Sequence, residues 1–207
     1  ERVKQFHAAL DEFQQGCLFF YFGHTDLVQH MFWRDRDPQH PGRTAEQAQQ
    51  FEHVVQDTYE ATDRLVGDAL DCLDEEDLLI VLSDHGFTSF RRGFNLNSWL
   101  IENGYLNLAM PDQREHLEFL VGVDWTRTRA YALGLNALYL NLAQREARGV
   151  VTAREQDQLL EEIAGKLKQV RDTDGAAIID TVYIVKKYYP NADGRIAPDM
   201  LIGYADH

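Results

Sequence analysis

The fold that this sequence predicts depends most on residues 78–87, LLIVLSDHGF. The stretch opens with five consecutive apolar side chains, as in a strand that is buried on both faces. It then changes abruptly to Asp84, His85 and Gly86. An acid and an imidazole at the end of a buried strand indicate a polar site at the edge of a sheet.

A second apolar run, CLFFYF at residues 17–22, has the same character, and a long helical pattern lies between the two runs. Thr44 and Gln47 have the spacing of a capping box, and apolar residues follow on one helical stripe as far as Leu73. Strand, crossover helix and strand form a βαβ unit, whose strands are parallel and end at the same edge. Ligands of open α/β sheets bind beyond that edge. We therefore expect the polar residues after both runs to meet.

The remainder of the chain predicts further strands and helices. Thr152 and Glu155 form another capping box, and Asn97 is the expected N-cap of a short helix that Gly104 closes. The predicted strands are RAYAL, ALYLNL, AAIIDTVYIV and DMLIGY. The expected fold is a three-layer α/β/α structure with a mainly parallel sheet, with residues 105–185 as a smaller subregion beside it.

Composition limits the kind of partner. The 207 residues are 44% hydrophobic and 26% charged, with a net charge of −14 and no dense run of Lys or Arg, so binding to a nucleic-acid backbone is not expected. No stretch approaches the roughly 20 apolar residues of a transmembrane helix. We interpret Cys17 and Cys72 as two buried thiols instead of a disulfide. The compartment stays open.

Two Asp/His pairs are the candidate site. Asp26 and His30 are four residues apart, so in a helix they share one face and can share a ligand. Asp84 and His85 are adjacent, and the turn at Gly86 can direct both toward one point. Two such pairs at one sheet edge suggest two divalent metal ions, Zn²⁺ first and Mn²⁺ or Fe next. The alternative is that the spacing is fortuitous, Asp84 caps a turn and His85 only packs.

Other polar and aromatic residues carry weaker signals. Arg91 and Arg92 could reach a substrate phosphate or form a solvated pair in a loop. His24 lies near Asp26 but is expected to be a solvated loop residue. The remaining histidines with no partner at ligand spacing are interpreted as surface residues, and the tryptophans as core or interface residues: His7, His40, His53 and His116, and Trp33, Trp99 and Trp125.

Four segments in colinear order resemble the later half of the type I phosphodiesterase/nucleotide pyrophosphatase branch of the alkaline phosphatase superfamily. They are FFYFGHTDLVQHMFWRDRDPQHP, VLSDHGFTSFRRGFNLNSWLIENGYL, WTRTRAYALGLNALYLNLAQREARGVV and APDMLIGY. The resemblance implies an alkaline-phosphatase-like fold, with residues 1–207 as one partial metallohydrolase domain. It also implies two-metal-dependent hydrolysis of a small phosphorylated substrate, a phosphoester or phosphodiester.

The resemblance assigns the ligands pair by pair. Asp26 and His30 would bind one zinc ion, and Asp84 and His85 the second. The family's Thr or Ser nucleophile and a further Asp ligand precede the region that these residues match, so the nucleophile is not assigned and we expect little activity from the chain alone. A third His ligand is also expected, but His207, in YADH, matches its motif poorly.

Three classes of function follow from these features. The first is the phosphohydrolase. The second is a phosphomutase or sulfatase relative on the same dimetal core, and the third is a non-catalytic metal-binding or interaction module. Two catalytic zinc ions take about six protein ligands, of which four are named here. A parallel sheet that lacks some of its strands would expose an unpaired edge, so we also expect self-association into a homo-oligomer.

Overall fold

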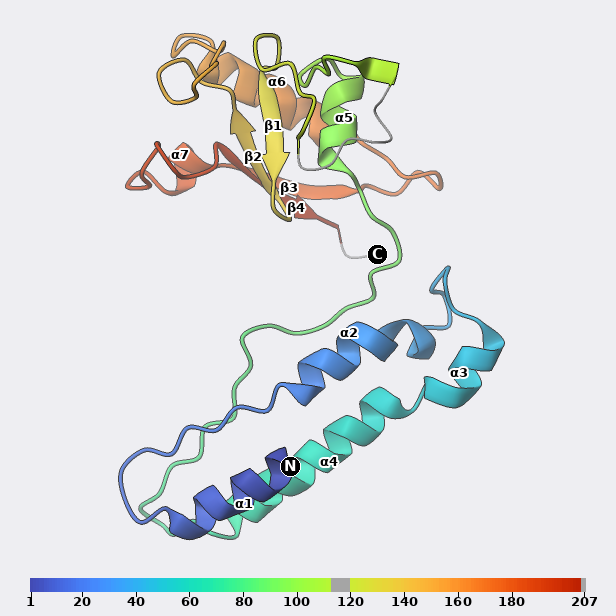
Figure 1. Cartoon of the computed structure of the whole chain (residues 1–207), viewed down its shortest axis with the longest axis vertical. Coiled ribbons are helices and arrows are strands. Elements are labelled where there is room, and N and C mark those ends of the chain that lie inside the picture. Colours follow the sequence, from blue (N-terminus) through green and yellow to red (C-terminus); the bar gives the residue numbers. More distant parts are fainter. Residues whose placement is uncertain (113–119, 206–207) are drawn as a thin grey trace. The chain divides into compact units, whose positions relative to one another are not determined.

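The structure is a computed structural model that describes residues 1–112 and 120–205 (Figure 1). It divides into two compact units: unit 1, Glu1–Arg92, and unit 2, the described chain from Gly93 onward. Each has a hydrophobic cluster of its own. No helix in the described parts is both long and apolar enough to cross a membrane.

Unit 1 is helical. Its elements are α1 (Arg2–Glu12), α2 (His24–Arg36), α3 (Ala45–Phe51) and α4 (Val54–Leu70). The small core joins α1 to α4 through Phe6, Leu65 and Ala69, and Phe20 and Phe22 pack against it. Helix α2 packs against α4 as well.

The predicted helix from Thr44 begins where expected but is divided. The Thr44 hydroxyl accepts the backbone N–H of Gln47 at 3.2 Å, which confirms the cap. A turn at Glu52 and His53 then separates α3 from α4. Glu52 pairs with Arg43 at 3.2 Å, so the end of α3 is tied back to the residues before its start.

The predicted parallel sheet is wrong. Residues 17–22 and 78–82 form no strand in the part of the chain that the structure describes, and both are drawn as irregular backbone in Figure 1. Most of their side chains are in solvent: Phe19 is 77% exposed and Leu82 73%, whereas Phe20 and Phe22 pack on the small core. A strand forms only where a neighbouring strand accepts and donates its backbone hydrogen bonds. In this chain neither run has such a neighbour among the described residues, because every paired strand lies in unit 2.

Unit 2 holds an antiparallel sheet. Its strands are β1 (Ala130–Leu133), β2 (Ala137–Leu140), β3 (Ile179–Ile184) and β4 (Met200–Tyr204), in the order β1-β2-β4-β3 (Figure 1). All three pairings are antiparallel. The four strands therefore lie within the predicted segments, but their direction in the sheet differs from the prediction. The class remains α/β.

Helices complete unit 2. They are α5 (Leu96–Glu102), α6 (Gln156–Leu167) and the short α7 (Val185–Tyr188). Helix α6 contacts β3 and α5 contacts β1. The core of unit 2 is large and closed, with fully buried side chains from the sheet, α5 and α6: Leu100, Leu138, Leu140, Leu159, Ile163, Leu167, Met200 and Ile202.

The helix ends of unit 2 correct one prediction and refine another. The N-cap of α5 is Asn95, whose Oδ1 accepts the N–H of Ser98 at 2.9 Å, whereas Asn97 exchanges hydrogen bonds with the backbone of Ala132. Gly104 follows α5 with a φ of +75°, as expected of a helix-ending glycine. Helix α6 begins one turn later than predicted, at Gln156.

The capping box that was predicted for Thr152 and Glu155 is only partly formed. Glu155 Oε2 accepts both the backbone N–H of Thr152, at 2.9 Å, and its hydroxyl, at 2.6 Å. The Thr152 hydroxyl is thus a donor to the acid, and Glu155 occupies the N-cap position of α6.

Both cysteines are exposed free thiols, so the predicted burial of Cys17 and Cys72 is wrong. Cys17 opens the exposed run at 17–22, and Cys72 lies in the turn that follows α4. Neither thiol belongs to the small core of unit 1.

A buried ion pair joins the elements of unit 2. Asp199 is 8% exposed and accepts Arg145 Nη2 and the backbone N–H of Leu140, each at 2.8 Å. Gln156 at the start of α6 donates to the other oxygen of Asp199 at 3.2 Å. Arg145 also donates to Glu146 at 3.0 Å. One carboxylate therefore connects β2, the residues before β4 and α6.

Candidate functional site

The first predicted pair lies on α2, one turn apart. Asp26 is in the first turn of the helix, and its Oδ1 is 3.4 Å from Nε2 of His30. The shared helix face that the spacing predicted is confirmed. The His30 side chain is 66% exposed and that of Asp26 42%, so the pair is accessible to a small ligand.

The second predicted pair reaches the same place. Nε2 of His85 is 3.8 Å from Oδ1 of Asp26 and 3.6 Å from Oδ2 of Asp84. The two pairs therefore meet although the βαβ unit that was expected to bring them together is absent. Asp26 is the shared member, because both imidazoles approach the same carboxylate oxygen.

One aromatic ring contacts both histidines. The ring centroid of Phe87 is 4.8 Å from that of His30 and 5.6 Å from that of His85. Phe87 also stacks on Trp33, with the ring centroids 5.9 Å apart. The ring restricts how the two imidazoles can turn, and the sequence analysis did not single it out. Trp33, predicted as a core or interface residue, is thus packed against the site.

The atom types of these donors, and the separation within a pair, suit the binding of a divalent metal ion. Carboxylate oxygen and imidazole nitrogen are zinc ligands at about 2.0–2.2 Å, which places two ligands of one tetrahedral ion about 3.3–3.5 Å apart. The separation of Asp26 and His30, 3.4 Å, agrees with that value, and the contacts of His85 are slightly longer. Across residues 1–112 and 120–205, no group of three or more His, Cys, Asp or Glu converges closely enough to hold an ion. The residues thus supply two half-sites and no closed set of ligands.

Arg91 has a carboxylate partner and is not a solvated loop residue. Its Nε and Nη2 donate to the two oxygens of Asp37, at 2.7 and 2.8 Å, and Nη1 donates to Gln39 at 2.8 Å. Asp37 is 6% exposed. The Arg91 guanidinium, with the Ser89 hydroxyl and the Gln39 N–H, holds the pKa of Asp37 well below its ordinary value of 3.8. The same ion pair raises the pKa of Arg91.

The ion pair disfavours the phosphate-binding interpretation of Arg91 as well. Its donors are already committed to Asp37 and Gln39, so a phosphate would have to displace a buried carboxylate. The signal that sequence reasoning missed is Asp37 itself, the first residue after α2, which stands directly before Pro38.

The other histidines of unit 1 lie outside the cluster. His24 Nε2 is 3.0 Å from the Thr62 hydroxyl on α4, so it is held by a helix and is not simply solvated. His7 lies 2.8 Å from Asp68, and His53 lies 3.6 Å from Glu52. The predictions for His116 and His207 fall outside the described residues.

Comparison with known proteins gives the family. Residues 2–207 match the family described as type I phosphodiesterase / nucleotide pyrophosphatase. The match covers nearly the whole chain, so the chain belongs to this family of phosphoester-hydrolysing enzymes, as the four segments predicted. No curated protein and no solved structure matches it.

Proposed function

We propose that this chain carries part of the metal site of a phosphoester- or phosphodiester-hydrolysing enzyme that acts on a small phosphorylated substrate. Asp26 and His30 bind one divalent ion, and Asp84 and His85 bind a second. Zn²⁺ suits this mixed carboxylate and imidazole set best, and Mn²⁺ is the next choice.

One observation carries the proposal: two Asp/His pairs 54 or more residues apart in sequence meet at the Asp26 carboxylate. Carboxylate and imidazole pairs also occur elsewhere in unit 1, at His7 with Asp68 and at Glu52 with His53. Only the cluster at Asp26 combines more than one imidazole with a carboxylate among the ion pairs of the described residues. That combination suits a site that holds divalent cations, which in turn can neutralise the charge of a phosphate.

Held by these residues, two divalent ions would supply activation of the attacking oxygen and neutralisation of the charge on the leaving oxygen of a phosphoryl group. The protein's own part is to hold the donors in place. Asp26 supplies negative charge between the two imidazoles, and Phe87 limits their rotation. Four protein ligands are fewer than the six or so that two catalytic ions take, so we propose that residues 1–207 alone turn over substrate slowly.

The test is direct metal binding by the chain. Zn²⁺ uptake is measured by calorimetry and by elemental analysis after gel filtration, for the wild type, Asp26→Asn and His85→Gln. Loss of a ligand is expected to weaken binding by at least about tenfold, and Asp26→Asn most, because Asp26 contacts both imidazoles.

The matched control is His7→Gln, which removes an imidazole that contacts a carboxylate in the same unit but outside the cluster. It should bind Zn²⁺ as the wild type does. If His7→Gln and His85→Gln weakened Zn²⁺ binding equally, Zn²⁺ would be binding the surface indiscriminately. That result would contradict the proposed site.

A further inference from the structure

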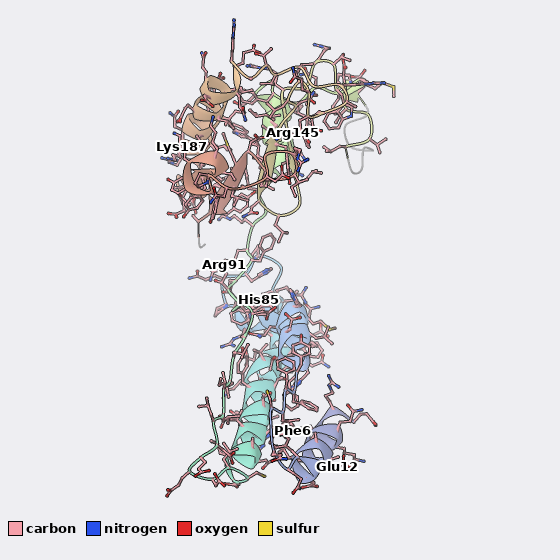
Figure 2. All side chains as sticks on the ribbon, turned by 90° about the vertical axis from the view of Figure 1, so that its left-hand side faces the viewer. Phe6, Glu12, His85, Arg91, Arg145 and Lys187 are labelled. Atoms are coloured by element: carbon pink, nitrogen blue, oxygen red, sulfur yellow. The ribbon has the colours of Figure 1, made fainter. Side chains whose placement is uncertain are left out.

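The segment after His85 runs along α2 with every second side chain turned toward it. His85 contacts Asp26, Phe87 contacts His30 and Trp33, and both partners of Phe87 belong to α2. Exposure alternates in step: residues 87, 89 and 91 are partly buried, whereas 86, 88 and 90 are exposed. Figure 2 labels His85 and Arg91 at two points of this segment.

The next two inward-facing residues continue the contacts. The Ser89 hydroxyl accepts Trp33 Nε1–H at 3.1 Å and also hydrogen-bonds the Asp37 carboxylate. Arg91 then makes its two-pronged ion pair with Asp37, directly beyond the end of α2. Between them, the backbone oxygen of Phe90 lies 3.0 Å from Nε2 of His40.

The ion pair is the strongest of these contacts. Both oxygens of Asp37 are engaged by the fork of the guanidinium, a geometry that fixes direction as well as distance. Asp37 is nearly inaccessible to water, whereas the Asp/His contacts of the cluster are exposed. Burial makes this pair costly to break from one side.

No regular secondary structure holds the segment elsewhere. Residues 77–92 contain neither a helix nor a strand, and the apolar run before Asp84 is exposed. The position of Asp84 and His85 relative to Asp26 and His30 therefore depends on the contacts of residues 87–91 with α2 and with the loop after it.

We propose that Phe87, Ser89 and Arg91, anchored by Trp33 and Asp37, are positioning residues that set the spacing between the two Asp/His pairs. We call this set the α2 clamp. The inference rests on the proposed function, because it assigns the clamp to the metal site described above. Residues outside the site can control metal affinity in this way, since partners that orient the ligands typically change it 10- to 100-fold.

The experiment compares the 207-residue wild type with Arg91→Met, Arg91→Lys and Asp37→Asn. Co²⁺ binding is followed by its visible absorption, which reports the ligand geometry, and hydrogen exchange is measured in the metal-free protein. Arg91→Met and Asp37→Asn should weaken Co²⁺ binding about 10- to 100-fold and speed exchange in residues 84–91. Arg91→Lys keeps the charge but loses the fork, so its affinity should lie between those of the wild type and Arg91→Met.

Arg195→Met is the matched control. Arg195 also forms a two-pronged pair, with Asp193, but on the exposed surface of unit 2. This variant should bind Co²⁺ as the wild type does. If Arg91→Met or Asp37→Asn loses its helical circular dichroism, Phe87→Leu takes its place. It removes the ring contacts to His30, His85 and Trp33 but leaves the ion pair of Arg91 with Asp37, and it should alter the Co²⁺ spectrum.

The outcomes separate the two proposals. Wild type that binds no Co²⁺ overturns the proposed function and the clamp's role with it. Wild type that binds Co²⁺, together with clamp variants of unchanged affinity and spectrum, overturns the clamp alone. Weakened binding in the clamp variants but not in Arg195→Met supports both.

Discussion

Units 1 and 2 both contain short apolar segments, but these are buried in unit 2 and mostly exposed in unit 1. In unit 2, β2 and β4 pair with their neighbours and place Leu138 and Met200 in a closed core. In unit 1, the run at 78–82 is at least as hydrophobic, yet Leu82 is 73% exposed. Apolar composition therefore predicts burial only where the fold offers backbone hydrogen-bond partners and a surface to cover the side chains.

The charged residues of the two units differ in the same way. Asp199 in unit 2 and Asp37 in unit 1 are buried and hold arginines, whereas the candidate site around Asp26 is exposed. Buried pairs fix structure, and exposed donors remain accessible to ligands. The following experiments test this contrast. Of the three tryptophans, Trp33 lies in unit 1 and Trp99 and Trp125 lie in unit 2, so each unit is followed in a background that keeps only Trp33 or only Trp125 and has Phe in place of the others.

The largest loss of unfolding free energy is expected when Asp199 is replaced. Asp199→Ala removes the partner of Arg145, an acceptor for the Leu140 N–H and an acceptor for Gln156. Losing one side of a buried ion pair costs about 3–5 kcal/mol of unfolding free energy. Urea unfolding followed by Trp125 measures it. Asp193→Ala, in an exposed pair of the same unit, is the control and should leave the midpoint unchanged; equal losses would contradict the distinction.

The next prediction compares the unfolding free energies of variants at two leucines, one buried and one exposed. Leu138→Ala empties a fully buried position in the core of unit 2 and should cost about 2–5 kcal/mol. Leu82→Ala makes the same change at an exposed position and should alter the unfolding free energy by no more than about 0.5 kcal/mol. Unfolding curves of both variants decide the matter. A cost at Leu82 close to that at Leu138 would show that the run at 78–82 is packed in solution.

The third prediction is that the stability of unit 1 depends on pH. Arg91 lowers the pKa of Asp37 in the folded state, so the ionised carboxylate stabilises unit 1 fully at pH values above its ordinary pKa of 3.8. That stabilisation is lost as the pH falls below 3.8 toward the lowered pKa. Trp33 fluorescence should therefore show the unfolding midpoint dropping across this acid range in the wild type. Asp37→Asn should flatten this part of the profile, and an unchanged slope would argue against the ion pair.

The smallest effect concerns association. The exposed runs at 17–22 and 78–82 predict that the chain self-associates at high concentration, as expected of unpaired apolar backbone. Ile80→Lys should lower the apparent mass in sedimentation experiments by placing a charge within one run. Leu135→Lys, at a 95% exposed turn of unit 2, should have no effect. A wild type that stays monomeric at every concentration would remove the basis of this prediction.

Part of the fold could be read from local patterns. The four strands of unit 2 and its helices α5 and α6 lie within the predicted segments, because their apolar periodicity agrees with the faces they bury. The short helix α7 was not predicted. Strand direction was predicted wrongly, because the run-helix-run pattern was taken as a parallel unit while the observed sheet uses only strands from residue 130 onward. The subregion 105–185 stays a prediction.

Some features of the candidate site could likewise be predicted from the sequence, and others could not. The sequence by itself determined the family, the donor types and the one-turn spacing of Asp26 and His30, because helix geometry fixes which residues share a face. Only the tertiary structure decided that Asp37 takes Arg91, that Phe87 contacts two imidazoles, and that the apolar runs are exposed. These contacts join residues 50 or so positions apart or depend on a neighbouring strand, and local periodicity carries no information about either.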